Sequence, residues 1–206
     1  MNTQKKLKYI YKMISSFRTW KEFVKSDLYR YEAKNDLKSL IKTYFIQEGF
    51  RYSFWLRTNN YLGNIKNKFF LIPIYLITKL IQRHLKFKFG LQIHSYGKID
   101  KGLYIPHFSG VFINGDVIIG KNFTISQGVS IGVTNRGSKK GTPVIGDNVY
   151  IGPGAKIIGN VNIGNDVAIG ANAVVTKDLP PFAVAAGVPA KIISLKGSEG
   201  YVNNRI

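Results

Sequence analysis

Aliphatic residues recur every six positions through most of the second half of the chain, and a further apolar row stands two residues ahead of them. A helix repeats every 3.6 residues and a half-buried strand every two, so neither element gives this pattern. A period of six is typical of a parallel β-helix. The first row is Ile113, Ile119, Ile125, Ile131, Ile145, Ile151, Ile157, Ile163, Ile169 and Val175, and the second is Val111, Val117, Phe123, Val129, Val149, Ala155, Val161, Val167 and Ala173.

The residue types fit a coil in which each six-residue unit supplies one short strand and one corner. Equivalent positions of neighbouring coils stack roughly 4.8 Å apart, so an aliphatic side chain packs on its equivalents above and below. Glycine suits the corners because tight turns often need positive φ, and Asn and Asp supply other turns, as in Gly-Asp-Asn at 146–148. A sandwich of many short strands is the alternative, but it predicts less regular spacing.

The period is first interrupted at 106–110. The step from Ile105 to Ile113 is eight residues instead of six. Either the register slips by two residues, or the row passes through Val111 and leaves His107 where an aliphatic residue would stand. Both interpretations place an irregularity around His107.

A second interruption follows Ile131, because the next residue of the row, Ile145, comes fourteen residues later. The added segment, GVTNRGSKKGTP at 132–143, is polar, glycine-rich and basic. A loop of this length on a tightly coiled repeat is more often functional than accidental. We therefore expect a functional loop here.

The region ahead of the repeat is predicted to be helical. Residues 1–25 are basic and weakly patterned, with a frayed start expected, and helices are predicted over 34–48, 50–62 and 65–89. We expect the following division of the chain: an α-helical N-terminal domain at 1–90, a β-helix domain at 91–193 and a polar, loose C-terminal tail at 194–206.

Positive charge is concentrated in the helical region. The formal charge is +19; residues 1–101 carry 21 Lys and Arg against 6 Asp and Glu, a net of +15, whereas residues 102–206 carry 9 against 5, a net of +4. The apolar run in 65–89 is about half of the ~20 residues that span a bilayer, and Pro73 interrupts it. The segment is either a helix packed on its neighbours or on another subunit, or a basic amphipathic segment on an anionic membrane face. No nucleic-acid-binding motif accompanies the charge, so no nucleic-acid partner is expected.

Two features bear on the cellular compartment. The chain has no cysteine, which excludes a disulfide framework and thiolate metal sites. Its first residues, MNTQKKLKYIYKM, lack an apolar signal core. We expect a cytoplasmic protein, with peripheral contact at the inner membrane face as an extension of the membrane hypothesis.

The candidates for proton transfer are three histidines. His84 lies among basic residues on a predicted helix and His94 follows the first aliphatic of the repeat, and both suit structural roles. His107 stands in the break, and histidine accepts a proton near neutral pH because its reference pKa is about 6.5. The residues alone leave His107 open between a catalytic base and a buried structural group. No metal is expected, because a zinc site needs three or four ligands and only two histidines fall in the repeat.

The region 92–193 resembles the hexapeptide-repeat acyltransferases, which have a left-handed β-helix, and is most similar to their serine O-acetyltransferase branch. Residues 1–90 share the helical character of that branch's N-terminal domain. The resemblance rests on the repeat, the surroundings of His107, the 132–143 loop and the closing AAGVPAK at 185–191. Individual positions that match are Ile93, His94, Lys98, Ile99, Gly102, His107, Gly110, Gly132, Ile151, Gly152, Gly154, Ala155, Lys156, Ile157 and Ala171.

The resemblance implies an acetyl-CoA-dependent O-acetyltransferase that works as a homotrimer, with two trimers able to pair through the N-terminal helices. His107 would be the general base, and backbone N–H groups of the segment starting at Gly132 would stabilise the oxyanion. A non-catalytic scaffold with the same fold is the competing hypothesis. The residues implied to hold the CoA are Gly132, Val133, Thr134, Pro153, Ala171 and Lys191.

Three departures from the serine branch change the expected acceptor. The branch has an aspartate that holds the histidine ring where this chain has Gln92, an acid where it has Pro106, and an Arg-His pair where it has Gly141-Thr142. Gln92 becomes the candidate for orienting His107. Because the charged groups that would recognise an amino acid are missing, a neutral hydroxyl is favoured. We expect a sugar of a bacterial-type surface polysaccharide (capsular or lipopolysaccharide) or its precursor, with serine or another small molecule as the alternative. Asn135, Arg136 and Thr142 are the candidate acceptor-loop residues.

Overall fold

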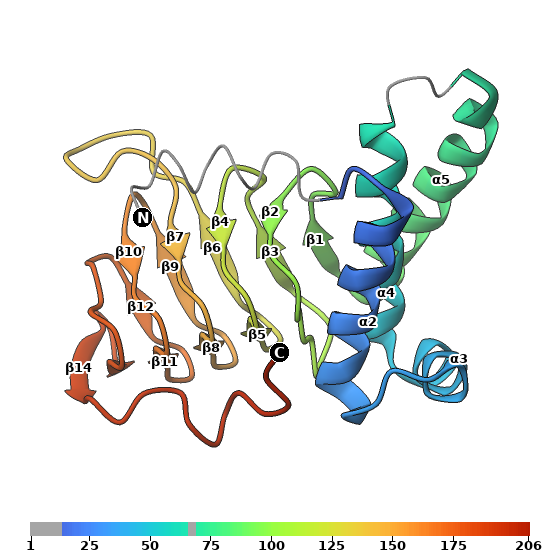
Figure 1. The fold of residues 1–206 in the computed structure, drawn as a ribbon. Helices are drawn as coiled ribbons and strands as arrows, with labels where there is room; N and C mark the ends of the chain where they lie inside the picture. The colour runs from blue at the N-terminus through green and yellow to red at the C-terminus, as the bar shows by residue number, and fades with distance from the viewer. Residues whose placement is uncertain (1–13, 66–68) are drawn as a thin grey trace.

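The computed structural model describes residues 14–65 and 69–206, and shows a bundle of helices leading into a three-sided prism of short strands (Figure 1). The expected left-handed parallel β-helix behind an α-helical region is confirmed. The frayed start expected at the N-terminus falls in residues 1–13, which lie outside the described residues. The helices are α2 (Phe17–Glu32), α3 (Leu37–Ile46), α4 (Glu48–Asn64), the 3-10 turn η1 (Phe69–Leu71) and α5 (Ile72–Phe89).

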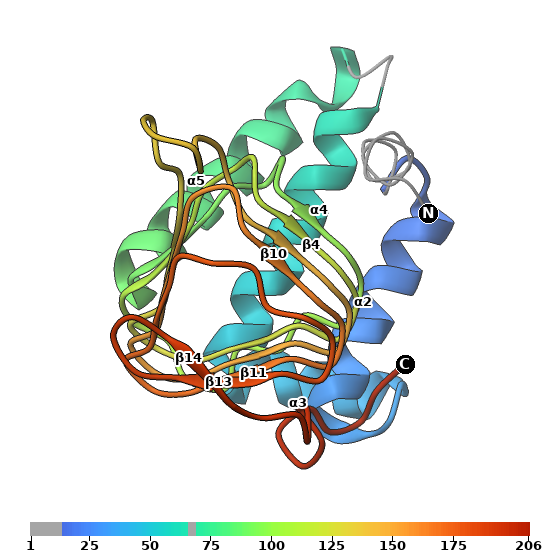
Figure 2. The same cartoon turned by 90° about the vertical axis from the view of Figure 1, so that its left-hand side faces the viewer.

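The prism has three walls, and each coil adds one strand or bridge to each wall (Figure 2). The pairing is parallel throughout the walls except between the last two strands. Sheet 1 contains β1 (Leu91–Ile93), β3 (Val111–Ile113), β6 (Ser130–Gly132), β9 (Lys156–Ile158) and β12 (Val174–Val175). Sheet 2 contains β2 (Lys98–Ile99), β4 (Ile118–Ile119), β7 (Val144–Ile145) and β10 (Asn162–Ile163). Sheet 3 contains β5 (Thr124–Ile125), β8 (Tyr150–Ile151), β11 (Ala168–Ile169), β13 (Val184–Ala186) and β14 (Lys191–Ser194).

Strand register decides between the two interpretations of the first interruption. Leu91 pairs with Val111 and Ile93 with Ile113. The aliphatic row therefore continues from Ile105 to Ile113, and the two extra residues are accommodated in the corner. His107 does not occupy an inward position. Both apolar rows predicted from the period of six form the buried core of the prism.

The helices join the prism through a buried ion pair between α2 and α4. Asp27 is fully buried and Arg57 is 3% exposed, and Arg57 Nε donates to Asp27 Oδ2 over 2.9 Å. Asp27 Oδ1 also accepts from the N–H groups of Gly102 and Leu103 at 2.9 and 2.8 Å. Arg57 in turn donates to backbone carbonyls at the end of β2, those of Ile99 and Asp100.

Two expectations about the ends of the chain need correction. α2 falls largely in the region interpreted as weakly patterned, and Ser16 caps its N-terminus by accepting from the N–H of Thr19. The C-terminal tail is not loose: it runs back along the prism towards α2 (Figure 1). Ser198 is fully buried and donates to the Asn148 carbonyl, and Arg205 pairs with Asp166 over 2.9 Å. Ser198 and Arg205 each bond to a residue of a different coil, and the composition of the tail gives no sign of these contacts.

The second half of the predicted 65–89 segment is amphipathic as expected. Thr78, Leu85 and Phe89 of α5 are buried, whereas Leu76 and Leu80 are more than half exposed. No helix in the described part of the chain is long and apolar enough to cross a membrane. Peripheral contact with an anionic membrane stays a prediction.

Candidate functional site

The first element of the candidate site is the corner at 106–110, which joins sheet 3 to sheet 1 in the first coil. The His107 side chain is exposed there, so the alternative of a buried structural histidine is wrong. Within 14–65 and 69–206 the imidazole has no hydrogen-bond partner. The next residue, Phe108, packs on Phe89 of α5 with ring centroids 5.2 Å apart. The corner is thus fixed against the helical region while His107 stays accessible to another molecule.

Corners of later coils stack on this one to form what we call the histidine edge, residues 106–110, 126–129, 152–155 and 170–173. The N–H of Gly128 donates to the Ser109 carbonyl at 2.9 Å, and that of Asn172 donates to the Pro153 carbonyl at 2.8 Å. The structure therefore brings His107, Pro153 and Ala171 onto one edge of the prism, although they lie far apart in the sequence.

A column of three stacked glycines runs along the middle of the histidine edge. Gly110, Gly128 and Gly154 all have positive φ, and a Cβ on Gly110 would lie 3.3 Å from the Cα of Gly128. Such an edge allows an extended ligand to approach the backbone. Gln127, which no sequence pattern singled out, has its Oε1 buried at this edge without a hydrogen-bond partner in the described residues. The only sequence signal for it is its place two residues after the core residue Ile125.

The 132–143 loop leaves the prism at a different corner, between sheets 1 and 2, and projects from its wall (Figure 1). Thr134 and Gly141 form two backbone hydrogen bonds, so the Thr134 N–H is occupied within the loop. Lys139 pairs with Asp178 over 2.9 Å, and this contact together with the Asn162 N–H lowers the pKa of the Asp178 carboxyl. The side chains of Val133, Asn135 and Arg136 are exposed, whereas Thr142 Oγ1 donates to the Asp116 carbonyl at 3.4 Å.

One chain does not bring His107 and the loop together. His107 precedes β3, at the start of the strands of sheet 1, whereas the loop follows β6, at the end of those strands. Sheet 1 therefore separates them. Lys191 is exposed on β14 at the far end of the prism.

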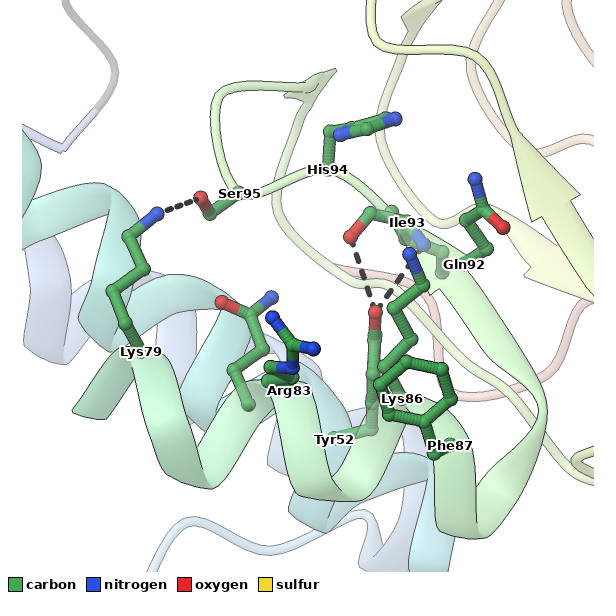
Figure 3. A pocket seen from close by; sticks show the side chains of 10 residues that line it. Tyr52, Lys79, Arg83, Lys86, Phe87, Gln92, Ile93, His94 and Ser95 are labelled. Atoms are coloured by element: carbon green, nitrogen blue, oxygen red, sulfur yellow. Dashed lines mark hydrogen bonds between the residues drawn. The ribbon is translucent and has the colours of Figure 1, made fainter. Parts of the chain in front are cut away.

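Gln92 lies on β1 in sheet 1 and pairs in register with Phe112. Its amide makes no hydrogen bond within the described chain, to His107 or to any other group, so its orienting role stays a prediction. Gln92 lines a cavity of about 330 Å³ between α5 and the β1 turn (Figure 3). His94 lines the same cavity, with its ring 4.9 Å from that of Tyr96. In the described residues, no three His, Cys, Asp or Glu side chains gather in one place.

Comparison with known proteins identifies relatives of this arrangement. Residues 142–177 match the family described as bacterial transferase hexapeptide (six repeats). The serine acetyltransferase of Staphylococcus epidermidis is 40% identical over 133 residues, which cover 65% of this chain and 62% of that protein. The chain therefore spans less than two thirds of the length of this curated relative.

Solved structures are similar over a larger part of the chain. The Neisseria gonorrhoeae serine acetyltransferase in complex with serine is 27% identical with a TM-score of 0.69, over 92% of this chain and 74% of that one. A serine acetyltransferase in complex with CoA is 28% identical with a TM-score of 0.68, over 92% and 75%.

These relatives overturn one expectation from the sequence. The sugar acceptor of a surface polysaccharide was inferred from the missing charges at Gln92, Pro106 and Gly141-Thr142, and it is wrong, because the relatives are serine acetyltransferases. The sugar acceptor was predicted from positions matched along the sequence alone, and such positions do not include every charge that can reach a site in space. In sequence and fold, the chain is similar to hexapeptide-repeat proteins of the serine acetyltransferase type.

Proposed function

We propose that the protein is an acetyl-CoA-dependent O-acetyltransferase and that the hydroxyl of serine is its acceptor. The observation that carries the proposal is the exposed His107 beside the stacked glycines Gly110, Gly128 and Gly154, on a chain whose relatives are serine acetyltransferases. The glycine column fits the extended pantetheine arm of CoA, with Pro153 and Ala171 alongside. Lys191 would meet a CoA phosphate as a point charge.

In the reaction, His107 accepts the proton of the serine hydroxyl as the oxygen attacks the carbonyl carbon of the thioester. The bond from carbon to sulfur then breaks, and CoA leaves with the proton that His107 held. O-Acetylserine and CoA are the products. Backbone N–H groups near Gly132 are the proposed oxyanion donors. The hydrogen bond from Thr134 to Gly141 leaves the residues before Thr134 as the better candidates.

We expect purified protein to release CoA from acetyl-CoA when L-serine is added, at a rate well above hydrolysis without acceptor. Thiol release followed with a chromogenic reagent measures this, and mass spectrometry identifies O-acetylserine. O-Methylserine is the matched control, because it lacks the hydroxyl proton. Equal CoA release with and without serine would exclude serine as the acceptor, and absence of release with any hydroxyl compound would favour the non-catalytic scaffold.

We also propose that the protein is a trimer in which the loop of one copy completes the site at His107 of its neighbour. The separation of His107 and the loop by sheet 1 supports this assembly. Pairing of two trimers through the helices would use the exposed apolar face of α3, which carries Leu37, Ile41 and Phe45.

Coexpression of two inactive variants tests the shared site. One variant is His107→Ala, and the other replaces residues 135–140 by Asn-Gly, a turn that suits the paired positions Thr134 and Gly141. Each variant alone should be inactive, whereas every mixed ring of three should have about one site in three with an intact histidine and an intact loop. Differently tagged copies, purified in tandem, give the activity of the mixed trimers. Mixed trimers without activity would place each site within one copy.

A further inference from the structure

The cavity between α5 and β1 is lined by basic and neutral groups only. Lys79, Arg83 and Lys86 face it from α5, while Gln92, His94 and Ser95 face it from β1 and the following turn (Figure 3). No Asp or Glu lines it, and the sequence has no acid at all between Glu48 and Asp100. The cations of the cavity repel one another. An anion that enters the cavity relieves this repulsion and is attracted by several cations at once.

In the described part of the chain, no ion pair with a carboxylate involves the cations of this cavity, in contrast to three cations elsewhere. Arg57, Lys139 and Arg205 each pair with an aspartate. In the described residues, Arg83 and Lys86 pair with no carboxylate; both lie beside the Phe87 ring, at 5.7 and 5.9 Å from its centroid. Lys79 Nζ donates to Ser95 Oγ at 2.9 Å, which holds the turn after β1 against the helix.

The floor of the cavity is rigid. The Tyr52 hydroxyl donates to the Ile93 carbonyl at 3.1 Å and accepts from the Ile93 N–H at 3.2 Å, so it clamps both polar groups of one strand residue. Tyr52 is 1% exposed, and burial raises the pKa of its hydroxyl, which therefore stays neutral. Gln82 is also buried beside it. A preorganised floor under free cations is what an anion subsite requires.

The cavity adjoins the corner of His107. The N–H of Val111, just after that corner, donates to the Gly90 carbonyl at 3.2 Å, just before β1. Phe89 packs on Phe108, and Gln92 belongs to the cavity itself. The cavity and the corner of His107 are therefore both fixed at the junction of α5 and β1.

We propose that Arg83 and Lys86 form an oxyanion-binding subsite beside the proposed acceptor site, with Gln92 and His94 as additional hydrogen-bonding groups. The oxyanion is either the carboxylate of the acceptor or a phosphate from a second ligand. Arg83 offers the planar fork that matches either group, and Lys86 adds a point charge. The assignment of the acceptor carboxylate as the ligand rests on the proposed function. The binding of an anion by Arg83 and Lys86 does not.

Calorimetric titration with inorganic phosphate at constant ionic strength tests the subsite without catalysis. The double variant Arg83→Gln/Lys86→Gln should bind phosphate at least about tenfold more weakly than the wild type, because it loses charge-assisted hydrogen bonds. Lys88→Gln is the matched control, since Lys88 is an exposed cation of the same helix outside the cavity and its loss should leave the affinity within about twofold. Equal phosphate affinity in the wild type and the double variant would overturn the proposal, as would absence of phosphate binding.

A second measurement distinguishes the source of the oxyanion. If the subsite takes the acceptor carboxylate, phosphate competes with serine, and the wild type prefers serine to serinamide in kcat/KM while the double variant loses that preference. If it takes a phosphate of another ligand, phosphate binds without competition and the preference is unchanged. Should serine prove not to be a substrate, phosphate binding that depends on Arg83 and Lys86 would still support the subsite, while the proposed function would fail.

Discussion

Replacing His107 by alanine should lower kcat by about 10²–10⁴-fold, the contribution typical of a positioned general base. The reason is that no other imidazole lies at the histidine edge: His94 lines the cavity beside α5, and His84 is exposed on α5. The KM for acetyl-CoA should change little, because the proposed CoA contacts are the stacked glycines Gly110, Gly128 and Gly154 together with Lys191, and the exposed His107 ring positions none of them. Steady-state kinetics with serine and acetyl-CoA measure both parameters.

Two controls separate catalysis from folding. His84→Ala removes an exposed histidine of α5 and should retain near-wild-type kcat. His107→Ala should keep the thermal midpoint of the wild type, because an exposed side chain without a partner contributes little to stability. A His107→Ala enzyme as fast as the wild type would show that His107 is not the base and that another group accepts the proton.

Removing either member of the Asp27–Arg57 pair should lower the free energy of unfolding by about 3–5 kcal/mol, because the remaining charge is left buried and uncompensated. Both side chains are inaccessible, and the pair is bidentate, with the second contact from Arg57 Nη2 to Asp27 Oδ1 at 3.2 Å. Asp27→Ala and Arg57→Ala, studied by denaturant unfolding, give the values. Single variants within about 1 kcal/mol of the wild type would contradict this role.

The double variant Asp27→Leu/Arg57→Leu sharpens the test. An isolated buried pair can often be replaced by apolar residues at little cost. Here the pair also serves the N–H groups of Gly102 and Leu103 and two carbonyls at the end of β2, so apolar replacement leaves several buried backbone groups unsatisfied. We therefore expect the double variant to remain destabilised, at about 1–3 kcal/mol for each unsatisfied group. Asp178→Ala, which breaks the exposed pair with Lys139, is the control and should cost at most about 1 kcal/mol.

Much of the candidate site could be named from the sequence because its residues interrupt a regular pattern. His107 and the 132–143 loop stand where the period of six fails, and an interruption is visible without coordinates. Gln127 could not be found in this way, because it follows the period and differs from other corner residues only in its unpartnered buried oxygen. The cations of α5 were visible as charge, but their position around a cavity next to Gln92 depends on how the helix packs on β1.

Prediction of the acceptor from positions matched along the sequence was misleading. The loss of charged groups at Gln92 and at Gly141-Thr142 predicted a neutral acceptor, but recognition depends on all charges that reach the site in space. Arg83 and Lys86 precede the matched region 92–193, and helix packing brings them beside Gln92. The relatives contradict the sugar acceptor, and the proposed subsite would give a physical reason why the missing loop charges do not decide the acceptor.

By itself the sequence determined the coil, its core and its two interruptions, because residues stacked at equivalent inward positions must all be apolar and therefore repeat visibly. Only the tertiary structure decided the register at 106–110, where Leu91 pairs with Val111 and turns His107 outward. It also decided that Asp27 and Arg57 meet and that the C-terminal tail bonds to Asn148 and Asp166. Each of these contacts joins two residues that lie far apart in the sequence, and neither residue belongs to a repeated pattern. Whether they form depends on how the helices and coils pack, which the order of residue types does not reveal.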